Sequence, residues 1–349
     1  MLRGKGFSVG LAAVAARARV SRQTVSNVLN APHRVAPETA ARVVRAIDEL
    51  GYRPNRTARN LRRRTSSLLG LCVSHRPGDV NAIFYRFVQS LTGAAREHGY
   101  HVLLFTPDDR NGDLATYDEL IRTGTVDGFA LAETHTGDDR PRWLAGRSIP
   151  FACFGRPWGS EDVAPAWVDV DGAAGTHAAT EHLIGHGHRD IAFLGWPPGS
   201  GTGDDRAAGW ANAMVKHGLD ARGMRGLAEN TVESATTAAT RLLAGDRVPT
   251  AFVCAHDTLA VGARRAAAAA GRPEVVAFGF DDTPVAAALT PPLSSVRQPV
   301  EQAGRVVVQL LIEQLTGAYA GREGVLLAPH LMLRGDDALI TTEVKSDDH

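Results

Sequence analysis

Residues 11–30, LAAVAARARVSRQTVSNVLN, constrain this chain more than any other stretch, because they have the pattern of two short helices joined by a tight turn. Ser21 belongs to the residue types that cap the beginning of a helix. Val25, Val28 and Leu29 follow at the spacing of one buried helical stripe. The polar side chains between them are expected to point outward, namely Arg22, Gln23, Ser26 and Asn27.

Outward guanidinium and amide groups of this kind can pair with base edges in the major groove of DNA. Helix-turn-helix proteins dock in this way, with the first part of the second helix against the bases. The pattern therefore predicts a DNA-binding domain over residues 1–53. The rest of the chain is then expected to decide when DNA is bound.

The charge of the chain is unevenly distributed, although 38 basic residues balance 38 acidic ones overall. Residues 1–65 contain 14 lysines or arginines and three acidic residues, a net charge of +11, so the remaining residues carry −11. A basic module on an acidic body is typical of a phosphate-binding domain. A solvated basic tail is the alternative, but these arginines lie among apolar residues at helical spacing.

A third helix is predicted to begin at Pro37, because proline is tolerated at the first helical position and Glu38 suits the first turn. Gly51 is expected to end this helix, and Tyr52 to close the small core. The apolar stripe of the helix is predicted to comprise Val43, Val44, Ile47 and Leu50.

Residues 54–65, PNRTARNLRRRT, can form a helix of two turns with Ala58 and Leu61 on one face. A helix this short is marginal on its own in water. One interpretation is a basic linker. The other is a hinge helix that orders only on DNA and inserts Leu61 into the minor groove as an apolar wedge.

From residue 66 onward, apolar strand-like runs alternate with helical segments in two successive series. This alternation predicts α/β architecture with doubly wound parallel sheets, and the two series predict two lobes. Ligands of such folds bind at the carboxyl ends of the strands, here in a cleft between the lobes.

Residues 14–30, followed by GYRPN at 51–55 and by Ala58 and Leu61, resemble the headpiece of the lactose-repressor (LacI/GalR) family of bacterial transcription regulators. The resemblance implies that the recognition helix reads bases and that the hinge enters the minor groove. The residues that it places at the DNA are Ser21, Arg22, Gln23, Thr24, Ser26, Asn27, Asn55, Arg56, Ala58 and Leu61.

Three positions of the headpiece depart from the pattern of that family, and one of them is Ala13, where the family has an aspartate in the first helix. Arg19 stands where the family has its turn glycine, so it must adopt or avoid a left-handed conformation. Asn27 stands where the family has an arginine, and an amide suits adenine better than guanine. The operator sequence therefore does not carry over from the family.

The segments VDGFALA, VDVDGAAG, EHLIGHGHRDIAFLG, DRAAGW, TAFVCAHDTLAVGA and VVAFGFDDTPVAAALTPPLSSVRQP resemble successive landmarks of the same family. Its effector domain is similar to periplasmic sugar-binding proteins. Gly155 replaces an aspartate of sugar-responsive members, which argues against a simple hexose pocket. The resemblance places the effector against Ser74, Phe84, Arg206, His256, Asp281 and Gln298.

We expect residues 66–165 and 293–326 to form the N-terminal lobe of this effector domain, and residues 166–292 and 327–343 to form the C-terminal lobe. No apolar run approaches the ~20 residues of a membrane-spanning helix, and no convincing signal peptide precedes the first helix. We therefore expect a cytoplasmic protein without membrane contact. Its reduced, buried thiols are predicted to be Cys72, Cys153 and Cys254.

His182, His186 and His188 suggest a metal site, but no HExxH motif or nearby cysteine ligand accompanies them. The glycine-rich run at 199–203 lacks the Gly-Lys-Ser/Thr of a phosphate-binding loop. No Ser/His/Asp set occurs in the context of a nucleophile elbow. We expect no metal, no cofactor and no enzyme activity.

The sequence as a whole predicts a ligand-controlled transcription regulator, in the first place a homodimeric repressor on a pseudo-palindromic operator of double-stranded DNA. A small polar effector, a sugar or related metabolite, would control the hinge helices. The alternatives are a solute-binding transport component and a sugar-modifying enzyme with an accessory DNA-binding domain. The end of the chain has no sustained leucine heptad repeat, which predicts a dimer rather than a tetramer.

Overall fold

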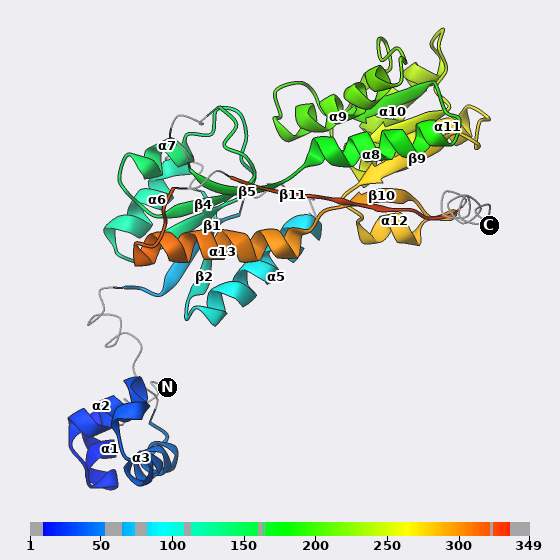
Figure 1. Ribbon diagram of the computed structural model, residues 1–349. Helices are drawn as coiled ribbons and strands as arrows, with labels where there is room; N and C mark the ends of the chain where they lie inside the picture. The colour runs from blue at the N-terminus through cyan, green and yellow to red at the C-terminus, as the bar shows by residue number, and fades with distance from the viewer. Residues whose placement is uncertain are drawn as a thin grey trace, which may run out of the picture. The chain divides into compact units, whose positions relative to one another are not determined.

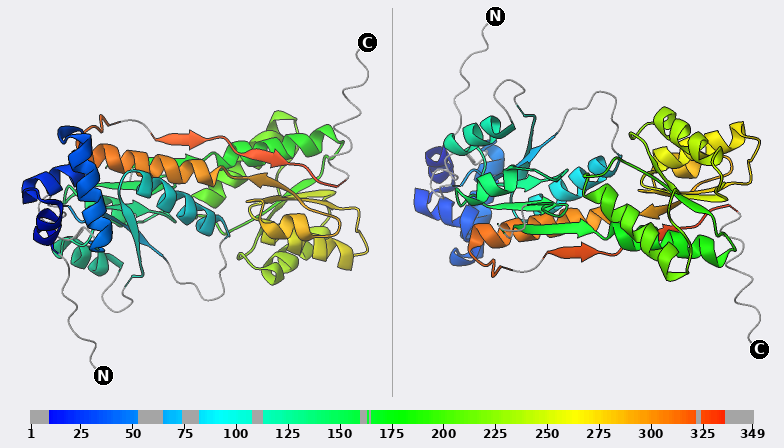
Figure 2. Two further views of the ribbon diagram at one scale, coloured as in Figure 1. Left: turned by 90° about the horizontal axis from the view of Figure 1, so that it is seen from below. Right: turned by 90° about the horizontal axis from the view of Figure 1, so that it is seen from above.

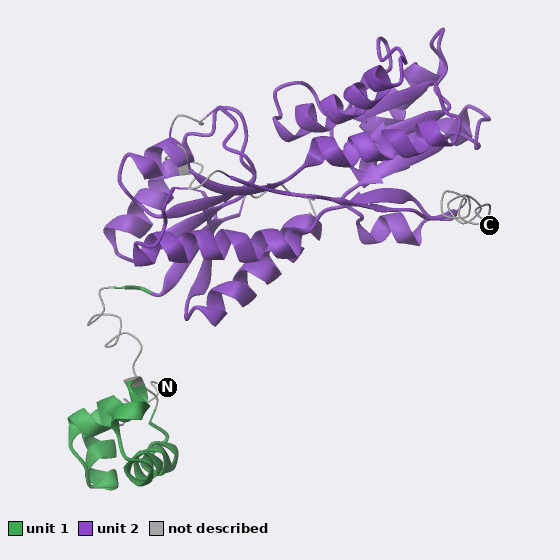
Figure 3. Cartoon of the chain, viewed as in Figure 1, with its two compact units in different colours: residues 1–66 green, residues 67–349 purple. Residues whose placement is uncertain are grey.

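The computed structural model (Figure 1, with two further views in Figure 2) describes residues 10–52, 65–73, 82–107, 113–159, 163, 165–321 and 324–335. The chain divides into two compact units, residues 1–66 and residues 67–349 (Figure 3). The division lies one residue after the 65/66 junction expected between the hinge segment and the body. Residues 53–64, which include nearly all of the predicted hinge helix, lie outside the described residues.

Three helices build the described part of the first unit: α1 (Leu11–Ala18), α2 (Arg22–Asn30) and α3 (Pro37–Glu49), with a short 3-10 turn at Pro32–Arg34. Ser21 caps α2 as predicted, because its side chain accepts a hydrogen bond from the Thr24 backbone N–H at 3.0 Å. Helix α1 packs against both other helices. Their shared core consists of Val14, Ala15, Ala18, Val25, Val28, Val43, Ala46 and Tyr52.

Arg19 adopts the left-handed conformation that glycine adopts most easily, with φ 54° and ψ 50°. Its backbone N–H bonds to the carbonyl of Ala16 at 3.2 Å, and the Val20 N–H bonds to the carbonyl of Ala15 at 2.9 Å. The turn therefore closes α1 in the manner of a glycine-ended helix. A left-handed conformation costs a residue with a Cβ about 1–2 kcal/mol, and Arg19 bears this strain.

Val44 does not belong to the core, contrary to the predicted stripe of α3, because its side chain is 48% exposed. Residues i, i+3 and i+4 share one face of a helix, so the face of Val43 continues at Ala46 and Ile47. Ala46 is buried, and Ile47 packs against the same core. The side chain next to Val43 in sequence therefore points away from the core.

The first sheet of the body has the strand order β11-β5-β4-β3-β1-β2, and its strand pairs are parallel. Its strands are β1 (Leu68–Cys72), β2 (His101–Phe105), β3 (Gly128–Leu131), β4 (Phe151–Phe154), β5 (Ala166–Val170) and β11 (Val325–Leu327). Two helices cover one face, α5 (Ala82–Glu97) and α13 (Val300–Thr316). Two others cover the opposite face, α6 (Asp113–Arg122) and α7 (Arg140–Ala145).

The second sheet has the order β12-β10-β9-β8-β6-β7, and its pairs are parallel except for the antiparallel pair of β10 and β12. Its strands are β6 (Ile191–Gly195), β7 (Arg225–Leu227), β8 (Ala251–Cys254), β9 (Val276–Phe280), β10 (Ser294–Arg297) and β12 (His330–Met332). Its helices are α8 (Gly172–Gly185), α9 (Thr202–Lys216), α10 (Val232–Leu243), α11 (Asp257–Ala269) and α12 (Pro284–Ala288).

Two strands lie in the opposite sheet from the one expected. Strand β5, expected to begin the second lobe, pairs with β4 and β11 of the first sheet, whereas β10, expected in the first lobe, pairs with β9 and β12. The lobe boundaries at 165/166 and 292/293 therefore move to the carboxyl ends of these strands. Strands buried on both faces look alike in sequence, so the pattern locates a strand without assigning it to a sheet.

The chain consequently passes between the lobes after β5, after β10 and between β11 and β12, and these three connections run side by side (Figures 1 and 2). Cys153 and Cys254 are buried and Cys72 is half-buried, and none of the three belongs to a disulfide. Within the described ranges, no helix combines the length and the apolar character needed to cross a bilayer.

Replacing Arg19 with glycine should stabilise the headpiece, because it removes a Cβ from the left-handed region. The greater flexibility of unfolded glycine offsets part of the gain, so we expect about 0.5–1 kcal/mol more opening free energy for the amides of α1 and α2. Native-state hydrogen exchange of the full chain measures this. Arg19→Ala, which removes the charge but keeps the Cβ, is the matched control and should give no gain. Faster exchange in Arg19→Gly would contradict the account.

Candidate functional site

The exposed face of α2 carries the predicted base-reading side chains in an ordered arrangement. Gln23 Nε2 donates to Asn27 Oδ1 at 3.0 Å, one helical turn away. Ser21 Oγ and Thr24 Oγ1 lie 2.9 Å apart, which adds a contact to the cap, and Arg22 is exposed. The helix therefore presents two amides and a guanidinium together, which are groups that pair with base edges.

The remaining predicted DNA contacts differ in what the structure describes. Ser26 is half-buried on α2. Asn55, Arg56, Ala58 and Leu61 lie outside the described residues, so the minor-groove role of the hinge stays a prediction. Ser74, predicted at the effector, also lies outside them.

Four of the predicted effector contacts meet at one edge of the second sheet. His256, Asp281 and Gln298 follow the ends of β8, β9 and β10, which are neighbours in that sheet. Arg206 comes from the beginning of α9. The carboxyl ends of parallel strands meet at one edge, which is where α/β proteins bind ligands. The name Asp281 cluster denotes Arg206, His256, Asp281 and Gln298.

Asp281 is the centre of the cluster, and it is 5% exposed. His256 Nε2 lies 3.0 Å from one carboxylate oxygen, while Gln298 Nε2 donates to the other, from which Arg206 Nη2 lies 3.7 Å away. The backbone of Asp281 has a φ of 98°, which residues other than glycine rarely adopt. Strain of this kind concentrates at functional sites.

The Arg206 guanidinium lies close to two aromatic rings. Its Cζ is 3.6 Å from the centroid of the Phe280 ring and 5.6 Å from that of Trp196. Its Nη1 donates to the Ala255 carbonyl at 2.6 Å, but its Nε, although buried, has no hydrogen-bond partner among the described residues. A buried donor without a partner costs about 1–3 kcal/mol, so a ligand acceptor at this point would be favourable.

Charge interactions set the protonation of the cluster. Burial on its own raises the pKa of Asp281, but Arg206 and His256 more than offset this and hold that pKa below its ordinary value. Burial lowers the pKa of His256, while the Asp281 carboxylate raises it, and the net pKa lies above the ordinary value. His256 also caps α11, because its Nδ1 accepts the Thr258 backbone N–H at 3.0 Å. An accepting Nδ1 carries no proton, so the neutral ring donates from Nε2 to Asp281.

Asp257 fixes the loops around the cluster, and sequence reasoning did not single it out. Its carboxylate accepts from Ser295 Oγ at 2.6 Å, from the Thr283 backbone N–H at 2.6 Å and from Thr283 Oγ1 at 2.7 Å. Burial raises the pKa of Asp257 to about 6, although these hydrogen bonds act in the opposite direction. No signal in the sequence marked Asp257, because acidic residues are common in the first turn of a helix.

The aromatic rings of the site also escaped sequence reasoning. Trp196 follows β6 and Phe280 ends β9, and aromatic residues at such positions are most often core. Phe84, which was predicted, lies at the beginning of α5 in the first lobe, with its ring 6.5 Å from that of Phe87. Phe87 in turn stacks on Phe154 at 4.6 Å. Phe84 therefore stands at the carboxyl edge of the first sheet, and its contact with an effector stays a prediction.

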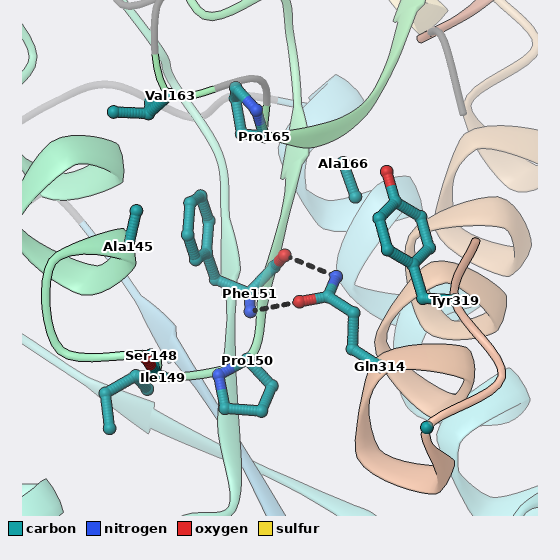
Figure 4. Close-up of a pocket in the computed structure, with 11 residues that line it drawn as sticks. Ala145, Ser148, Ile149, Pro150, Phe151, Val163, Pro165, Ala166, Gln314 and Tyr319 are labelled. Carbon is teal, nitrogen blue, oxygen red and sulfur yellow. Dashed lines mark hydrogen bonds between the residues drawn. The ribbon is translucent and has the colours of Figure 1, made fainter. Parts of the chain in front are cut away.

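A pocket of about 400 Å³ lies elsewhere, at the amino end of β4 and the carboxyl end of α13 (Figure 4). The Gln314 amide bridges the backbone of Phe151, accepting its N–H at 3.2 Å and donating to its carbonyl at 2.7 Å. No predicted site residue lines this pocket.

The histidines that suggested a metal have other contacts. His186 Nδ1 lies 2.6 Å from the His182 carbonyl, and His188 Nδ1 lies 2.9 Å from Thr250 Oγ1. In the part of the chain that the structure describes, no group of three or more potential ligands could hold a metal ion.

Comparison with known proteins identifies the two units. The family described as bacterial regulatory proteins, lacI family, matches residues 11–55, and the periplasmic binding protein-like domain matches residues 180–335. The transcriptional regulator CelR of Thermobifida fusca is 36% identical over 330 residues, which cover 92% of this chain and 96% of CelR. The chain belongs to the lacI family of bacterial regulatory proteins. It is a sequence-specific DNA-binding transcription regulator, as the sequence predicted.

Solved structures of the family confirm the predicted fold. The structure of the CelR–cellobiose complex is 32% identical, covers 93% of this chain and 99% of its own, and has a TM-score of 0.71. The lac repressor dimer bound to operator and the anti-inducer ONPF is 27% identical, covers 93% and 98%, and has a TM-score of 0.78. The helix-turn-helix headpiece and the two-sheet α/β body of the regulator are thus both those of the family.

The raised pKa of Asp257 makes a prediction about pH. Between about pH 4 and pH 6 the folded protein keeps this carboxyl protonated while the unfolded chain ionises it, so stability falls as pH rises through this window. We expect Asp257 to contribute a fall of about 3 kcal/mol. Urea unfolding at a series of pH values measures it. The slope should be flatter in Asp257→Asn, and an unchanged slope would contradict the assignment.

Proposed function

We propose that this regulator is a homodimeric, cytoplasmic repressor that binds a pseudo-palindromic operator, and that a neutral, sugar-like effector at the Asp281 cluster controls it. The observation that carries the proposal is the cluster itself, in which a buried carboxylate, an arginine and two further donors converge at the ligand-binding edge of the sheet. We further propose that the protein takes no cofactor, touches no membrane and has no catalytic activity.

The DNA part of the proposal rests on α2. Arg22 and Gln23 are exposed on this helix, and Gln23 is hydrogen-bonded to the half-buried Asn27. Two copies of one headpiece related by a two-fold axis require two related half-sites, which explains the palindrome. The lac repressor dimer is bound to its operator in the structure whose fold this chain shares.

The effector part rests on charge and on hydrogen-bonding capacity. Arg206 faces Asp281, and the nearby Arg156 is paired with Asp169 and Asp205, so each of these cations already has a carboxylate. A phosphorylated or carboxylate ligand would have to displace one of them. A neutral polyhydroxy ligand instead donates to Asp281 and accepts from Arg206 Nε. The rings of Trp196 and Phe280 suit the apolar side of a sugar.

CelR, a relative of this chain, was solved with cellobiose. A neutral disaccharide is therefore the first effector to test, and Gly155 is consistent with a ligand other than a simple hexose. A solute-binding transport component and a sugar-modifying enzyme, the two alternatives, are not favoured, because the relatives that match 92–94% of the chain are transcription regulators.

Gln23→Ala should weaken binding to the operator and relax its specificity, because one pair of base contacts is lost. We expect a cost of ~1–3 kcal/mol on the cognate site and little change on random DNA. Fluorescence anisotropy at fixed salt measures both affinities. Glu38→Gln, a change at an exposed position of α3, serves as the control. Equal losses on operator and random DNA would refute base reading by Gln23.

Asp281→Asn should weaken the binding of cellobiose, because the amide keeps the volume but loses the charge and one acceptor. Hydrogen bonds to a charged group contribute about 1.5–3 kcal/mol, so we expect a loss of about 10- to 100-fold in calorimetric titration. Glucose 6-phosphate should not bind the parent protein. The control is Asp190→Asn, whose carboxylate pairs with Arg247 at 2.8 Å on the surface of the same lobe.

Operator affinity without sugar should stay within about twofold in Asp281→Asn, because the substitution leaves the headpiece unchanged. Loss of operator binding with retained cellobiose binding would mean that Asp281 is structural and not part of an effector site.

A further inference from the structure

One guanidinium joins the two lobes. Arg156 follows β4 in the first lobe, and its Nε donates to the carboxylate of Asp169, on β5 of the same sheet, at 3.0 Å. Its Nη2 donates to the carboxylate of Asp205, on α9 of the second lobe, at 2.6 Å. The side chain is thus held by its own lobe and reaches across to the other.

The acceptor in the second lobe lies beside the effector cluster. The same Asp205 oxygen accepts the Ala173 backbone N–H at 3.0 Å, at the beginning of α8, just after the chain has crossed between the lobes. Arg206, the next residue, belongs to the Asp281 cluster, and its carbonyl accepts from Thr176 Oγ1 at 2.6 Å. A Cβ on Gly172 would approach the Asp205 carboxylate to 3.1 Å and Arg206 Cγ to 3.0 Å. Side chains on α9 therefore lie against the first turn of α8 with no space between them.

Trp158 adds a second contact between the lobes. The Arg156 guanidinium lies 4.6 Å from the centroid of its ring. A Cβ on Gly201 would come within 2.6 Å of the same ring, so Trp158 lies against the loop that begins α9. The ring shields the ion pair from water, and the side chains of Arg156 and Asp205 are only 22% and 15% exposed. Charges that are partly buried attract each other more strongly than exposed ones.

We propose that Arg156 is an interlobe latch: by binding Asp205, the residue next to Arg206 of the Asp281 cluster, it holds the first lobe against the second, and so sets effector affinity without contacting the effector. The predicted influence of Arg156 on effector affinity rests on the function proposed above, whereas its influence on the contact between the lobes does not. Arg156 is in this sense a positioning residue. Asp169 orients the Arg156 guanidinium, Asp205 accepts its hydrogen bond from the second lobe, and the Trp158 ring packs over it.

The alternative is that Arg156 serves only the first lobe through Asp169. The two roles are separable because the second-lobe partner can be changed alone. Asp205→Asn removes the charge that attracts Arg156 but keeps an oxygen for the Ala173 N–H. Arg156→Met removes the cation and leaves every hydrogen bond within the second lobe in place. Any loosening of second-lobe amides in Arg156→Met must therefore come through the contact between lobes.

Hydrogen exchange of the full chain, followed by mass spectrometry, tests the latch without any ligand. We expect residues 172–176 and 201–206 to exchange about five- to tenfold faster in Arg156→Met and in Asp205→Asn. The double variant should be no faster than either single one, because both remove the same interaction. Arg247→Met is the control, since Arg247 pairs with Asp190 inside the second lobe. It should leave these segments unchanged.

A change confined to β4 and β5, or additive effects in the double variant, would overturn the latch. Calorimetric titration of cellobiose supplies the second readout. Both single variants should bind it about five- to tenfold more weakly than the parent while Arg247→Met binds it normally, and parent-like binding in both would overturn the positioning role. If the parent itself does not bind cellobiose, the proposed sugar is wrong and the exchange result alone decides the latch.

Discussion

A buried carboxylate organises the regulatory part of this protein. A charge out of water is costly unless it is paired, and Asp281 is paired by groups from α9, from the end of β8 and from the end of β10. The positions of these elements therefore depend on one another. In the proposed mechanism, a ligand that offers its own donors to Asp281 competes with Gln298 and His256, so that its binding changes which elements are held together.

Gln298 connects this exchange of partners with the rest of the body. It stands where the chain leaves β10 and enters α13, the long helix that packs on α5 and on the first sheet. A shift at Gln298 therefore moves one of the three connections between the lobes. Near a second connection, the proposed Arg156 latch opposes separation of the lobes. The first sheet begins soon after the hinge segment, with β1 at Leu68, and the backbone N–H of the preceding Ser67 donates to the Asp127 carboxylate at 2.8 Å. Tightly packed lobes of this kind move as units rather than deform, which suits a two-state switch.

Local features were predictable from the sequence, and long-range pairings were not. The Ser21 cap and most of the headpiece core follow from spacing within one helix, and only the place of Val44 was wrong. Strands β5 and β10 were located but assigned to the wrong sheet, because the sequence of a buried strand does not indicate which strand it pairs with. The Asp281 cluster came from family resemblance. Arg156 and Asp205 are paired only through the fold, across 49 positions of sequence, and no local pattern marks them.

In the proposed function, a neutral ligand in the body controls the affinity of the headpiece for DNA. The most direct test of this control is the affinity of the full chain for an operator selected from random DNA, measured by anisotropy as cellobiose is added to saturation. We expect a change of about tenfold or more, since couplings of this kind amount to about 1–3 kcal/mol. Calorimetry on the same sample verifies that cellobiose saturates the protein. An unchanged operator affinity at saturation would contradict control of DNA binding by this ligand.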